Sequence, residues 1–460
     1  MAPVYKFDQK KKFVKAIPYT YADDPGTVKG YMSGYYTTDL TEERNNSYNI
    51  TTQFYANYEK TLGSHRVTAM IGYEDYYSEW EDLGAARQQF LLDRYPYLNV
   101  GPEDYRDNSG SGSHYGYRSF FGRATYSFDS RYMIQANIRR DASSRFAEDY
   151  RWATFPSVSA GWMISEESFI KKLKWENVLS SLKLKASWGT LGNERINSNY
   201  FPYQALKDFG TAWMYNGNEL SSMNTAYQAK YAVHDITWET TETWNIGLES
   251  TFFKGRLRFN ADIYKKKTKD MLLALEIPSF TGFDNPDINS GHMHTKGYDI
   301  EVGWNDKIGD FRYSVSANMS DFVSEMGNLG GTEFLGEQVK MEGSEFNEWY
   351  GYLSDGLYLT QEDLDNSPKL NNNVKVGDVK YKDISGPDGV PDGIISSEYD
   401  RVCLGGSLPR YMFGLNLTAA WKGFDLAMSF QGVGKQNSRI YTSMVGGLAD
   451  NWTNLPALID

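Results

Sequence analysis

Carboxylates recur at short intervals in one stretch of the chain, DISGPDGVPDGIISSEYD, which runs from Asp383 to Asp400. Calcium takes several hard oxygen ligands that converge across tight turns, and the interposed glycines permit such turns. The stretch therefore predicts a calcium loop. The expected ligands are Asp383, Asp388, Asp392 and Glu398. Pro387 and a second Asp-Gly pair depart from the spacing of an EF-hand, so an acidic turn held by side-chain hydrogen bonds to the backbone is the alternative.

Aromatic residues in two long polar segments form a second group with binding chemistry. They are Trp213, Tyr215, Trp349, Tyr350 and Tyr352. An aromatic ring can stack on a sugar ring or on a peptide side chain, so these positions are candidates for the capture of glycans or peptides. Aromatic rings are also ordinary at the rims of membrane barrels, and an interfacial role is the alternative for all five.

Sequence signatures of catalysis are missing from the chain. It contains no nucleophile elbow, phosphate-binding loop, dinucleotide fingerprint or His-Glu-x-x-His motif. His292 and His294 stand two residues apart and could share one face of a strand. No third metal ligand accompanies them, so a loop or rim role is favoured over a metal site. The sequence therefore predicts a protein that is not an enzyme.

Charge and hydropathy exclude several classes of protein. Lysine and arginine number 47 against 59 acidic residues, and the net charge of -12 without a basic stripe is the wrong electrostatics for nucleic acid. No run approaches the ~20 apolar residues of a membrane-spanning helix. Aromatic residues make up 15% of the chain, while the mean hydropathy is only -0.57. Both values suit a membrane barrel, because only every second residue of a spanning strand meets lipid.

Alternation of apolar and polar residues is the dominant pattern along the chain, and it predicts β-strands. In residues 311–320 the odd-numbered positions are apolar and the even-numbered positions are polar. One face of such a strand suits lipid and the other suits water. About twelve strands are expected, with one or two more before residue 45. They lie near 48–60, 66–79, 116–128, 131–141, 155–164, 182–190, 238–253, 256–268, 297–305, 311–321, 410–421 and 424–434.

The connections between these strands alternate between short turns and long polar loops. Short turns are expected near 62–64, 129–130, 254–255, 306–310 and 422–423. Long loops are expected near 80–115, 142–154, 191–237, 269–296 and 322–409. This sorting is typical of an outer-membrane barrel, in which the short turns are periplasmic and the long loops are extracellular. The predicted fold is all-β, a transmembrane antiparallel β-barrel to which the whole range 1–460 contributes.

Two smaller segments have predictions of their own. Residues 165–181 form a medium-length connection on the side of the short turns, and for segment 165–178 within it we favour an irregular turn over one or two helical turns. Residues 109–113 alternate serine with glycine. Because nothing in that segment can bury apolar surface, we expect it to be a flexible loop tip.

Several phrases within these strands and loops resemble those of one known family. They are RRDASSRF at 139–146, FPSVSAGW at 155–162, ASWGTLGN at 186–193, WET at 238–240, NIGLE at 245–249, KGYD at 296–299, GDVKY at 377–381 and KGFDL at 422–426. In this order and spacing they make the chain, from about residue 60 to its end, similar to the SusC/RagA-like family of TonB-dependent outer-membrane transporters. Ala142 stands where that family usually has glycine, and the stretch from Asp383 to Asp400 is longer than the common form.

The resemblance implies a multi-pass protein of the cell outer membrane that imports large nutrients, either glycan or peptide fragments. It also implies a SusD-like surface lipoprotein as partner and energy supplied by TonB through an N-terminal region. The family's plug domain and TonB box are not found in the chain, and residues 1–30 show no export signal. Plugged barrels have ~22 strands, so we expect about twelve to fourteen strands here to be the C-terminal portion of a larger barrel, truncated at both ends.

Two other interpretations fit parts of the sequence. A complete smaller barrel would act as a passive porin, although the missing export signal and the missing terminal aromatic strand argue against it. A surface glycan-binding β protein that does not transport would leave the sorting of the loops by length unexplained. An importer is therefore the function that the sequence favours.

Overall fold

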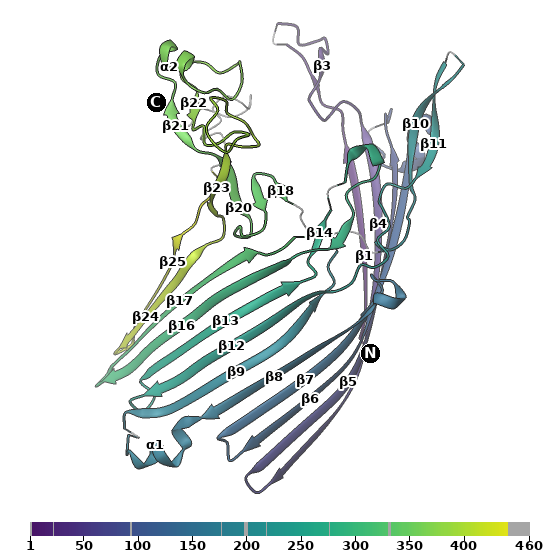
Figure 1. Cartoon of the computed structure of the whole chain (residues 1–460). Helices are drawn as coiled ribbons and strands as arrows, with labels where there is room; N and C mark the ends of the chain where they lie inside the picture. Colours follow the sequence, from purple (N-terminus) through teal and green to yellow (C-terminus); the bar gives the residue numbers. More distant parts are fainter. Residues whose placement is uncertain are drawn as a thin grey trace.

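The computed structural model describes residues 2–439, apart from residues 22, 93, 176, 197–200, 218, 276 and 330–332. One curved antiparallel sheet of 13 strands makes up most of the molecule (Figure 1). Its strands in spatial order are β1 (Ala2–Val14), β4 (Asp39–Leu62), β5 (His65–Arg87), β6 (Arg106–Phe128), β7 (Tyr132–Ser143), β8 (Trp152–Met163), β9 (Leu179–Asn193), β12 (Glu239–Phe252), β13 (Leu257–Lys269), β16 (His292–Ile308), β17 (Phe311–Met326), β24 (Arg410–Trp421) and β25 (Phe424–Lys435).

Spatial order in this sheet follows sequence order, so the strands form an up-and-down meander. Within the described residues, β1 and β25 are the two edges, and the sheet is an open barrel wall. Each strand predicted from alternation has its counterpart, and β1 is the further strand expected before residue 45. The predicted all-β, partial barrel fold is therefore confirmed.

Smaller elements lie in the connections. The short strands are β2 (Pro18–Tyr19), β3 (Gly30–Tyr31), β10 (Asp208–Asn216), β11 (Glu219–Tyr227), β14 (Leu272–Ala274), β15 (Asp287–Asn289), β18 (Phe334–Leu335), β19 (Gln338–Lys340), β20 (Glu348–Tyr352), β21 (Ser354–Leu357), β22 (Val379–Tyr381) and β23 (Arg401–Gly406). The helices are α1 (Ser168–Lys172), α2 (Gln361–Asn366) and five single turns, at Leu98–Val100, Glu103–Tyr105, Glu148–Tyr150, Ile164–Glu166 and Ser279–Thr281. Each helix in the described part of the chain is too short to cross a membrane.

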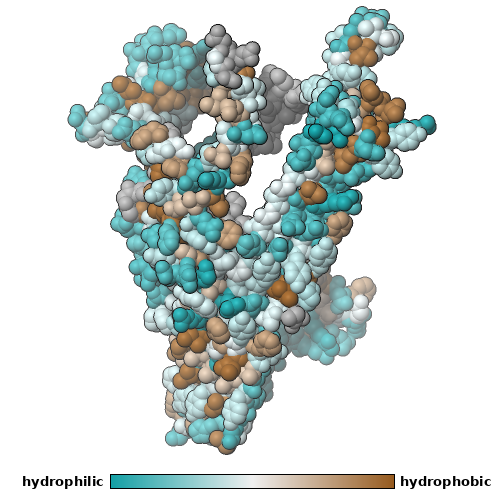
Figure 2. Space-filling view, turned by 90° about the vertical axis from the view of Figure 1, so that its right-hand side faces the viewer, coloured by the Kyte–Doolittle hydropathy of each residue, from teal (hydrophilic) through white to brown (hydrophobic). Residues whose placement is uncertain are grey.

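One face of the sheet, here called the outward face, exposes apolar side chains in register across neighbouring strands. Ile263 of β13 lies opposite Tyr298 of β16, and Ile300 of β16 lies opposite Met319 of β17. So much exposed apolar surface is unfavourable in water, and it is the surface that a barrel presents to lipid. Figure 2 shows hydrophobic side chains exposed on the lower, tapering part of the molecule, where β4 and β5 meet.

Two bands of aromatic side chains border the outward face. The lower band includes the ring pairs His65–Phe128 and Phe253–Trp304, and the upper band includes Tyr73–Phe120 and Trp188–Trp244, with centroids 4.8, 6.1, 5.2 and 6.0 Å apart. At a rise of ~3.4 Å per residue and a tilt of ~40°, the path along β6 from Phe120 to Phe128 spans roughly 20 Å of height. This height is close to that of the apolar belt of a membrane barrel, ~25 Å.

The turns at the lower end of the sheet are tight and need left-handed backbone conformations. Asp129 and Ser130, between β6 and β7, have φ of 49° and 56°. Lys422 and Gly423, between β24 and β25, have φ of 44° and 89°. Positive φ at both central residues gives the turn a twist that matches the strands, so the hairpins close without a loop. Short turns at one end and long loops at the other are the arrangement that the sequence predicts (Figure 1).

The predicted boundaries of the loop near 80–115 are wrong at both ends. β5 continues to Arg87 and β6 already begins at Arg106. Residues 109–113, predicted as a flexible loop tip, pair with the stretch from Gly84 to Trp80 in regular antiparallel register. Serine and glycine there leave room for the larger side chains of β5, and the backbone ladder needs no apolar alternation outside the membrane. The hairpin therefore projects well beyond the ~9–11 residues that span a bilayer.

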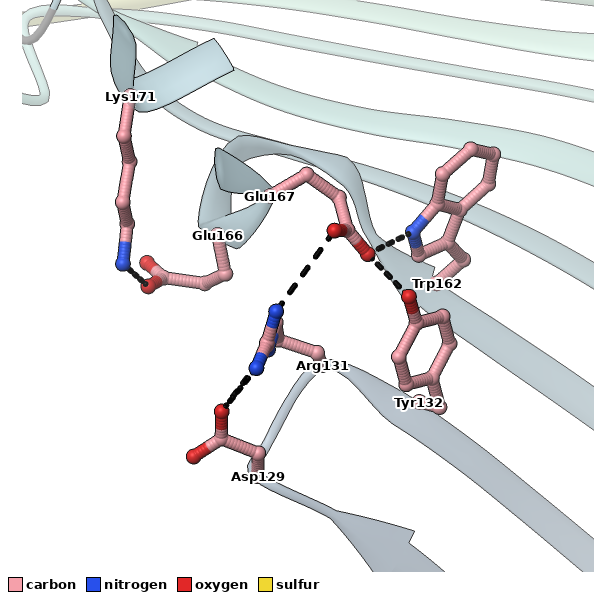
Figure 3. Close-up of polar contacts among 7 residues, drawn as sticks. All are labelled: Asp129, Arg131, Tyr132, Trp162, Glu166, Glu167 and Lys171. Atoms are coloured by element: carbon pink, nitrogen blue, oxygen red, sulfur yellow. Dashed lines mark hydrogen bonds and ion pairs between the residues drawn. The ribbon is translucent and has the colours of Figure 1, made fainter. Parts of the chain in front are cut away.

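The connection at 165–181 contains helical structure, so the irregular turn favoured from the sequence is wrong. Glu167, at the start of α1, accepts hydrogen bonds from the Trp162 indole at 3.1 Å and from the Tyr132 hydroxyl, and lies 3.7 Å from Arg131 (Figure 3). These hydrogen bonds, first that from Tyr132 and then that from Trp162, lower the pKa of Glu167. One carboxylate thus ties α1 to the ends of β7 and β8.

Buried apolar side chains gather where the long loops fold onto the upper end of the sheet. The larger cluster consists of Phe146, Phe155, Ile196, Ile236 and Trp238. The indole of Trp238 also donates to the backbone oxygen of Arg151 at 2.9 Å. A second cluster, of Met271, Met326 and Leu329, lies at the ends of β13 and β17. These clusters, rather than a layer beneath the sheet, hold the loops in place.

Candidate functional site

The inward face of the sheet carries a network of ion pairs that joins β9, β12 and β13. Lys185 Nζ lies 3.1 Å from Glu249 Oε1 and 3.1 Å from Asp262 Oδ2, and Lys183 Nζ donates to Glu249 at 3.2 Å. A β-carbon at Gly247 would lie 2.3 Å from both Lys185 and Asp262. Glycine at this position therefore leaves the space in which the central ion pair forms.

A concave recess of about 1150 Å³ opens on the same face, near the lower turns. Polar side chains that line it include Arg66, Thr68, Gln135, Lys185, Ser187 and Asn245. Charged groups of both signs, together with hydrogen-bond donors and acceptors, keep such a wall hydrated. They also give a polar solute alternative hydrogen-bond partners along it. The inward face therefore suits polar cargo or another polypeptide, and it does not suit lipid.

A second polar network lies higher on the inward face, across β5, β6 and β7. Arg139 donates to Asp141 at 2.7 Å and to Ser119 at 2.7 Å, and it lies 3.4 Å from Glu74. Ser119 is fully buried and Asp141 is nearly so. A planar guanidinium that serves three partners at once fixes the relative positions of the three strands.

The predicted aromatic residues Trp213 and Tyr215 lie on β10, which forms a projecting two-stranded ribbon with β11 (Figure 1). They alternate along the strand and so share one face of the ribbon. Their side chains are 68% and 77% exposed. Both rings are therefore available to stack on a ligand.

The other predicted aromatic residues have partners within the protein. The Trp349 indole donates to the backbone oxygen of Asn437 at 2.8 Å. The guanidinium of Arg401 lies over the ring of Tyr350, 4.5 Å from its centroid. Tyr352 packs against another ring in the same loop, that of Tyr381. All three are partly buried on or beside β20, and the structure does not bring them to the ribbon that carries Trp213 and Tyr215 (Figure 1).

The acidic stretch from Asp383 to Asp400 is organised by hydrogen bonds to the backbone. Asp383 accepts from the amide of Gly393 at 2.6 Å, and Asp392 accepts from that of Ile394 at 2.9 Å. Within the described residues, no group of three or more acidic, histidine or cysteine side chains is placed to hold a metal ion. The structure therefore does not gather the four expected ligands, of which Asp388, Asp392 and Glu398 are exposed.

Calcium binding at this stretch stays a prediction from the sequence. It is supported by Oδ1 of Asp383, a buried oxygen that accepts no hydrogen bond. If the loop closes on calcium, titration calorimetry of the protein with calcium chloride gives a saturable heat that Asp383→Asn removes, because a hard cation needs the full carboxylate charge. A heat unchanged by the substitution, or no heat at all, would contradict the prediction.

The residues of the two inward-facing networks are further candidates that the sequence did not single out. Lys185, Asp262 and Arg139 each lie within a predicted strand, and alternation places them on its polar side. Their partners depend on the pairing register of three separate strands, which alternation within one strand does not specify. The sequence did offer one signal for these networks, namely charged residues that recur on the polar side of several predicted strands.

A curved sheet with an apolar outward face, aromatic bands at two heights, a charged inward face and loops sorted by length is the wall of an outer-membrane barrel. The family model described as TonB dependent receptor-like, beta-barrel matches residues 5–443. The chain belongs to this family of TonB-dependent receptors, and it is a protein of the outer membrane that crosses by strands.

Two curated relatives and one solved structure illustrate the likeness. Over 401 residues the chain is 30% identical to a TonB-dependent receptor of Formosa agariphila, with 84% of this chain and 38% of the relative covered. Over 433 residues it is 27% identical to the TonB-dependent receptor SusC of Bacteroides thetaiotaomicron, with 90% and 40% covered. The RagAB peptide transporter matches in fold with a TM-score of 0.75 at 24% identity, over 93% of this chain and 44% of that chain. The chain thus spans about 40% of its curated relatives' length.

Proposed function

We propose that the chain forms part of the wall of a TonB-dependent importer of large polar nutrients, namely peptide or glycan fragments. The inward ion-pair network around Lys185 carries this proposal, because a charged and hydrated wall lets a polar solute pass without meeting lipid. The likeness in fold to a peptide transporter supports import as the activity and peptides as one class of cargo. Neither a passive porin nor a surface glycan-binding protein receives comparable support.

The partners in this proposal are TonB, which supplies energy, and a SusD-like lipoprotein on the cell surface. The upper ends of the loops offer exposed apolar side chains to such a partner, among them Phe209 on β10 and Leu359 beside α2. Isolated apolar residues are normal on a surface, but their concentration on projecting elements is typical of an interaction site. Co-purification of a surface lipoprotein with the intact protein tests this part of the proposal.

Cargo capture by the aromatic ribbon is testable by uptake into cells. Replacing Trp213 and Tyr215 with alanine is expected to lower the uptake of a fluorescent oligopeptide or oligosaccharide about tenfold at subsaturating concentration, since an aromatic contact contributes ~0.5–1.5 kcal/mol beyond its buried area. The readout is the initial rate of TonB-dependent uptake at equal amounts of protein in the outer membrane.

Met214 and Met223 provide the matched control, because they lie on the opposite face of the same ribbon and are also exposed, each at 52%. Their replacement with alanine is expected to leave uptake unchanged. Equal uptake by the aromatic variant and the wild-type protein would remove the ribbon from the proposal. Uptake that persists in cells without TonB would overturn the proposed importer itself.

A further inference from the structure

Basic residues lie directly opposite one another on the outward face, at the upper ends of β13 and β16. Lys265 is paired with Lys296, and Lys267 is paired with His294. Strand alternation puts Lys265 and Lys267 on the same side as Ile263, which belongs to the exposed apolar face. Lys265 and Lys296 are themselves exposed. A cluster of positive charge therefore stands on the lipid side of the wall.

On the inward side of β13 and β16 the space is occupied by other side chains of the two strands, so the three lysines must point outward. Thr268 and Thr295 are buried there. The hydroxyls of Thr241 and Thr268 lie 3.0 Å apart, and those of Thr295 and Ser324 lie 2.8 Å apart. Because successive residues of a strand point to opposite faces, the lysines cannot reach the barrel interior without breaking these contacts.

Charge near this cluster is poorly balanced by the protein. Glu242 of the neighbouring strand β12 lies directly opposite Lys267, but its carboxylate accepts from the Trp188 and Trp244 indoles at 3.1 and 3.2 Å and from Lys269 at 3.0 Å. On the other side Glu325 of β17 lies opposite His294. Among the described residues no ion pair includes Lys265, Lys267 or Lys296.

Like charges directly opposite each other across two strands destabilise a sheet. An anion bound between Lys265, Lys267 and Lys296 would remove this repulsion.

The level of the lysine cluster relative to the membrane indicates the source of that anion. Lys265 is the cross-strand neighbour of Trp244, whose ring packs with that of Trp188 in the upper aromatic band. Aromatic bands mark the level of the lipid headgroups, and lysine side chains at that level extend along apolar surface to place their charge there. The loops above this end are extracellular, so the adjacent headgroups are those of the outer leaflet.

The geometry points to a lipid-binding site in which Lys265, Lys267 and Lys296 hold the phosphoryl group of an anionic outer-leaflet lipid. Three ammonium groups offer a phosphoryl group strong, charge-assisted hydrogen bonds as point charges of complementary sign. The acyl chains of such a lipid would lie on the apolar surface directly below, around Ile263 and Ile300. The site faces away from the lumen, so it is independent of the cargo and of the proposed import.

The test uses intact protein extracted from the outer membrane and stripped of lipid in neutral detergent. The probes are phosphorylated lipid A, the same lipid without its phosphates, and inorganic phosphate. Binding is measured by native mass spectrometry, and stabilisation by the shift in Tm. Wild-type protein is expected to bind phosphorylated lipid A and to gain Tm, and to respond neither to the dephosphorylated lipid nor to phosphate alone.

The variant replaces Lys265, Lys267 and Lys296 with glutamine. It is expected to bind phosphorylated lipid A roughly 100-fold more weakly, since each lysine near a charged membrane surface contributes a factor of about five. Lys266→Gln is the matched control: the same charge is removed from the same strand, but from its inward side, where Lys266 lies 5.0 Å from the Tyr264 ring centroid. Its binding is expected to equal that of the wild type.

Several results would overturn this assignment. The first is equal binding of phosphorylated lipid A by the wild type and the triple variant. The second is a Tm gain from inorganic phosphate as large as that from phosphorylated lipid A. The third is binding of the dephosphorylated lipid as tight as that of the phosphorylated lipid. If the triple variant does not fold, Lys296→Gln alone must still weaken binding about fivefold. Without lipid, the triple variant should be at least as stable as the wild type, because the like-charged cross-strand pair of Lys265 and Lys296 is gone.

Discussion

Replacing Asp400 with alanine is expected to unfold much of the loop domain, defined as residues 327–409 between β17 and β24. The Asp400 side chain is fully buried. One carboxylate oxygen accepts from the amides of Ile384 at 2.7 Å and Ser385 at 3.3 Å, and the other accepts from Ser396 at 2.7 Å. Alanine leaves all three part-buried amides without this acceptor, which costs about 3 kcal/mol of the domain's stability.

Hydrogen exchange of the intact protein in detergent measures this effect. Amides from β21 to β23 should lose protection in Asp400→Ala, while those in the middle of β13 and β16 keep it. Asp388→Ala is the control, because Asp388 is an exposed carboxylate of the same acidic stretch. Asp400→Asn should fall between the two, since its amide nitrogen would face the donor of Ser396. Wild-type protection in Asp400→Ala would refute this account of the loop.

The same carboxylate gives the loop domain a defined response to acid. Burial alone would raise the pKa of Asp400, but hydrogen bonds from the amides of Ser396, Ile384 and Ser385 outweigh it and hold the pKa below the usual range of aspartate. A lowered pKa in the folded state means that the charge stabilises the domain fully above the ordinary value of ~3.9. Protection should therefore be constant from neutral to mildly acidic pH and fall only below that value.

The membrane-spanning part of the fold was predictable because lipid imposes a simple rule on each strand. Residues 311–320 must alternate, since one side meets lipid and the other meets water, and β17 follows that alternation. Above the membrane the rule no longer applies. Ser113 pairs with Trp80 through the backbone ladder, which needs no apolar side chain, so the serine and glycine composition of 109–113 gave no sign of a strand.

The candidate site was predictable as a set of residue types but not as an arrangement. Trp213 and Trp349 are equivalent in the sequence, yet one is exposed on a ribbon and the other is bound to the backbone of Asn437. Likewise Asp400 was not among the expected ligands, although its carboxylate is the one that closes the acidic stretch. Such differences depend on contacts between residues distant in sequence, and spacing does not encode them.

A largely buried ion pair stabilises the start of β24, where the chain returns from the loop domain to the sheet. Arg410 Nε and Nη2 donate to the two oxygens of Asp321 at 2.6 and 2.7 Å, and the amide of Tyr411 donates to Asp321 at 3.1 Å. The two side chains of the ion pair are only 19% and 7% exposed. Tyr411 has a positive φ of 53°, which is unfavourable for a residue with a bulky side chain. The contacts with Asp321 hold this irregular start of β24 in place.

Asp321→Ala is expected to lower the free energy of unfolding by about 3 kcal/mol, because it leaves a largely buried guanidinium with only Glu345, 4.0 Å away, as an acidic neighbour. Arg410→Lys should cost less, since lysine keeps the charge but cannot bind both oxygens at once. Replacing Asp321 with leucine and Arg410 with methionine together should be less harmful than Asp321→Ala alone, because no charge then remains buried. Denaturant titration in detergent, followed by aromatic fluorescence, measures all three. A loss below about 1 kcal/mol in Asp321→Ala would mean that the pair is solvated like a surface salt bridge and that Tyr411 is held by the backbone alone.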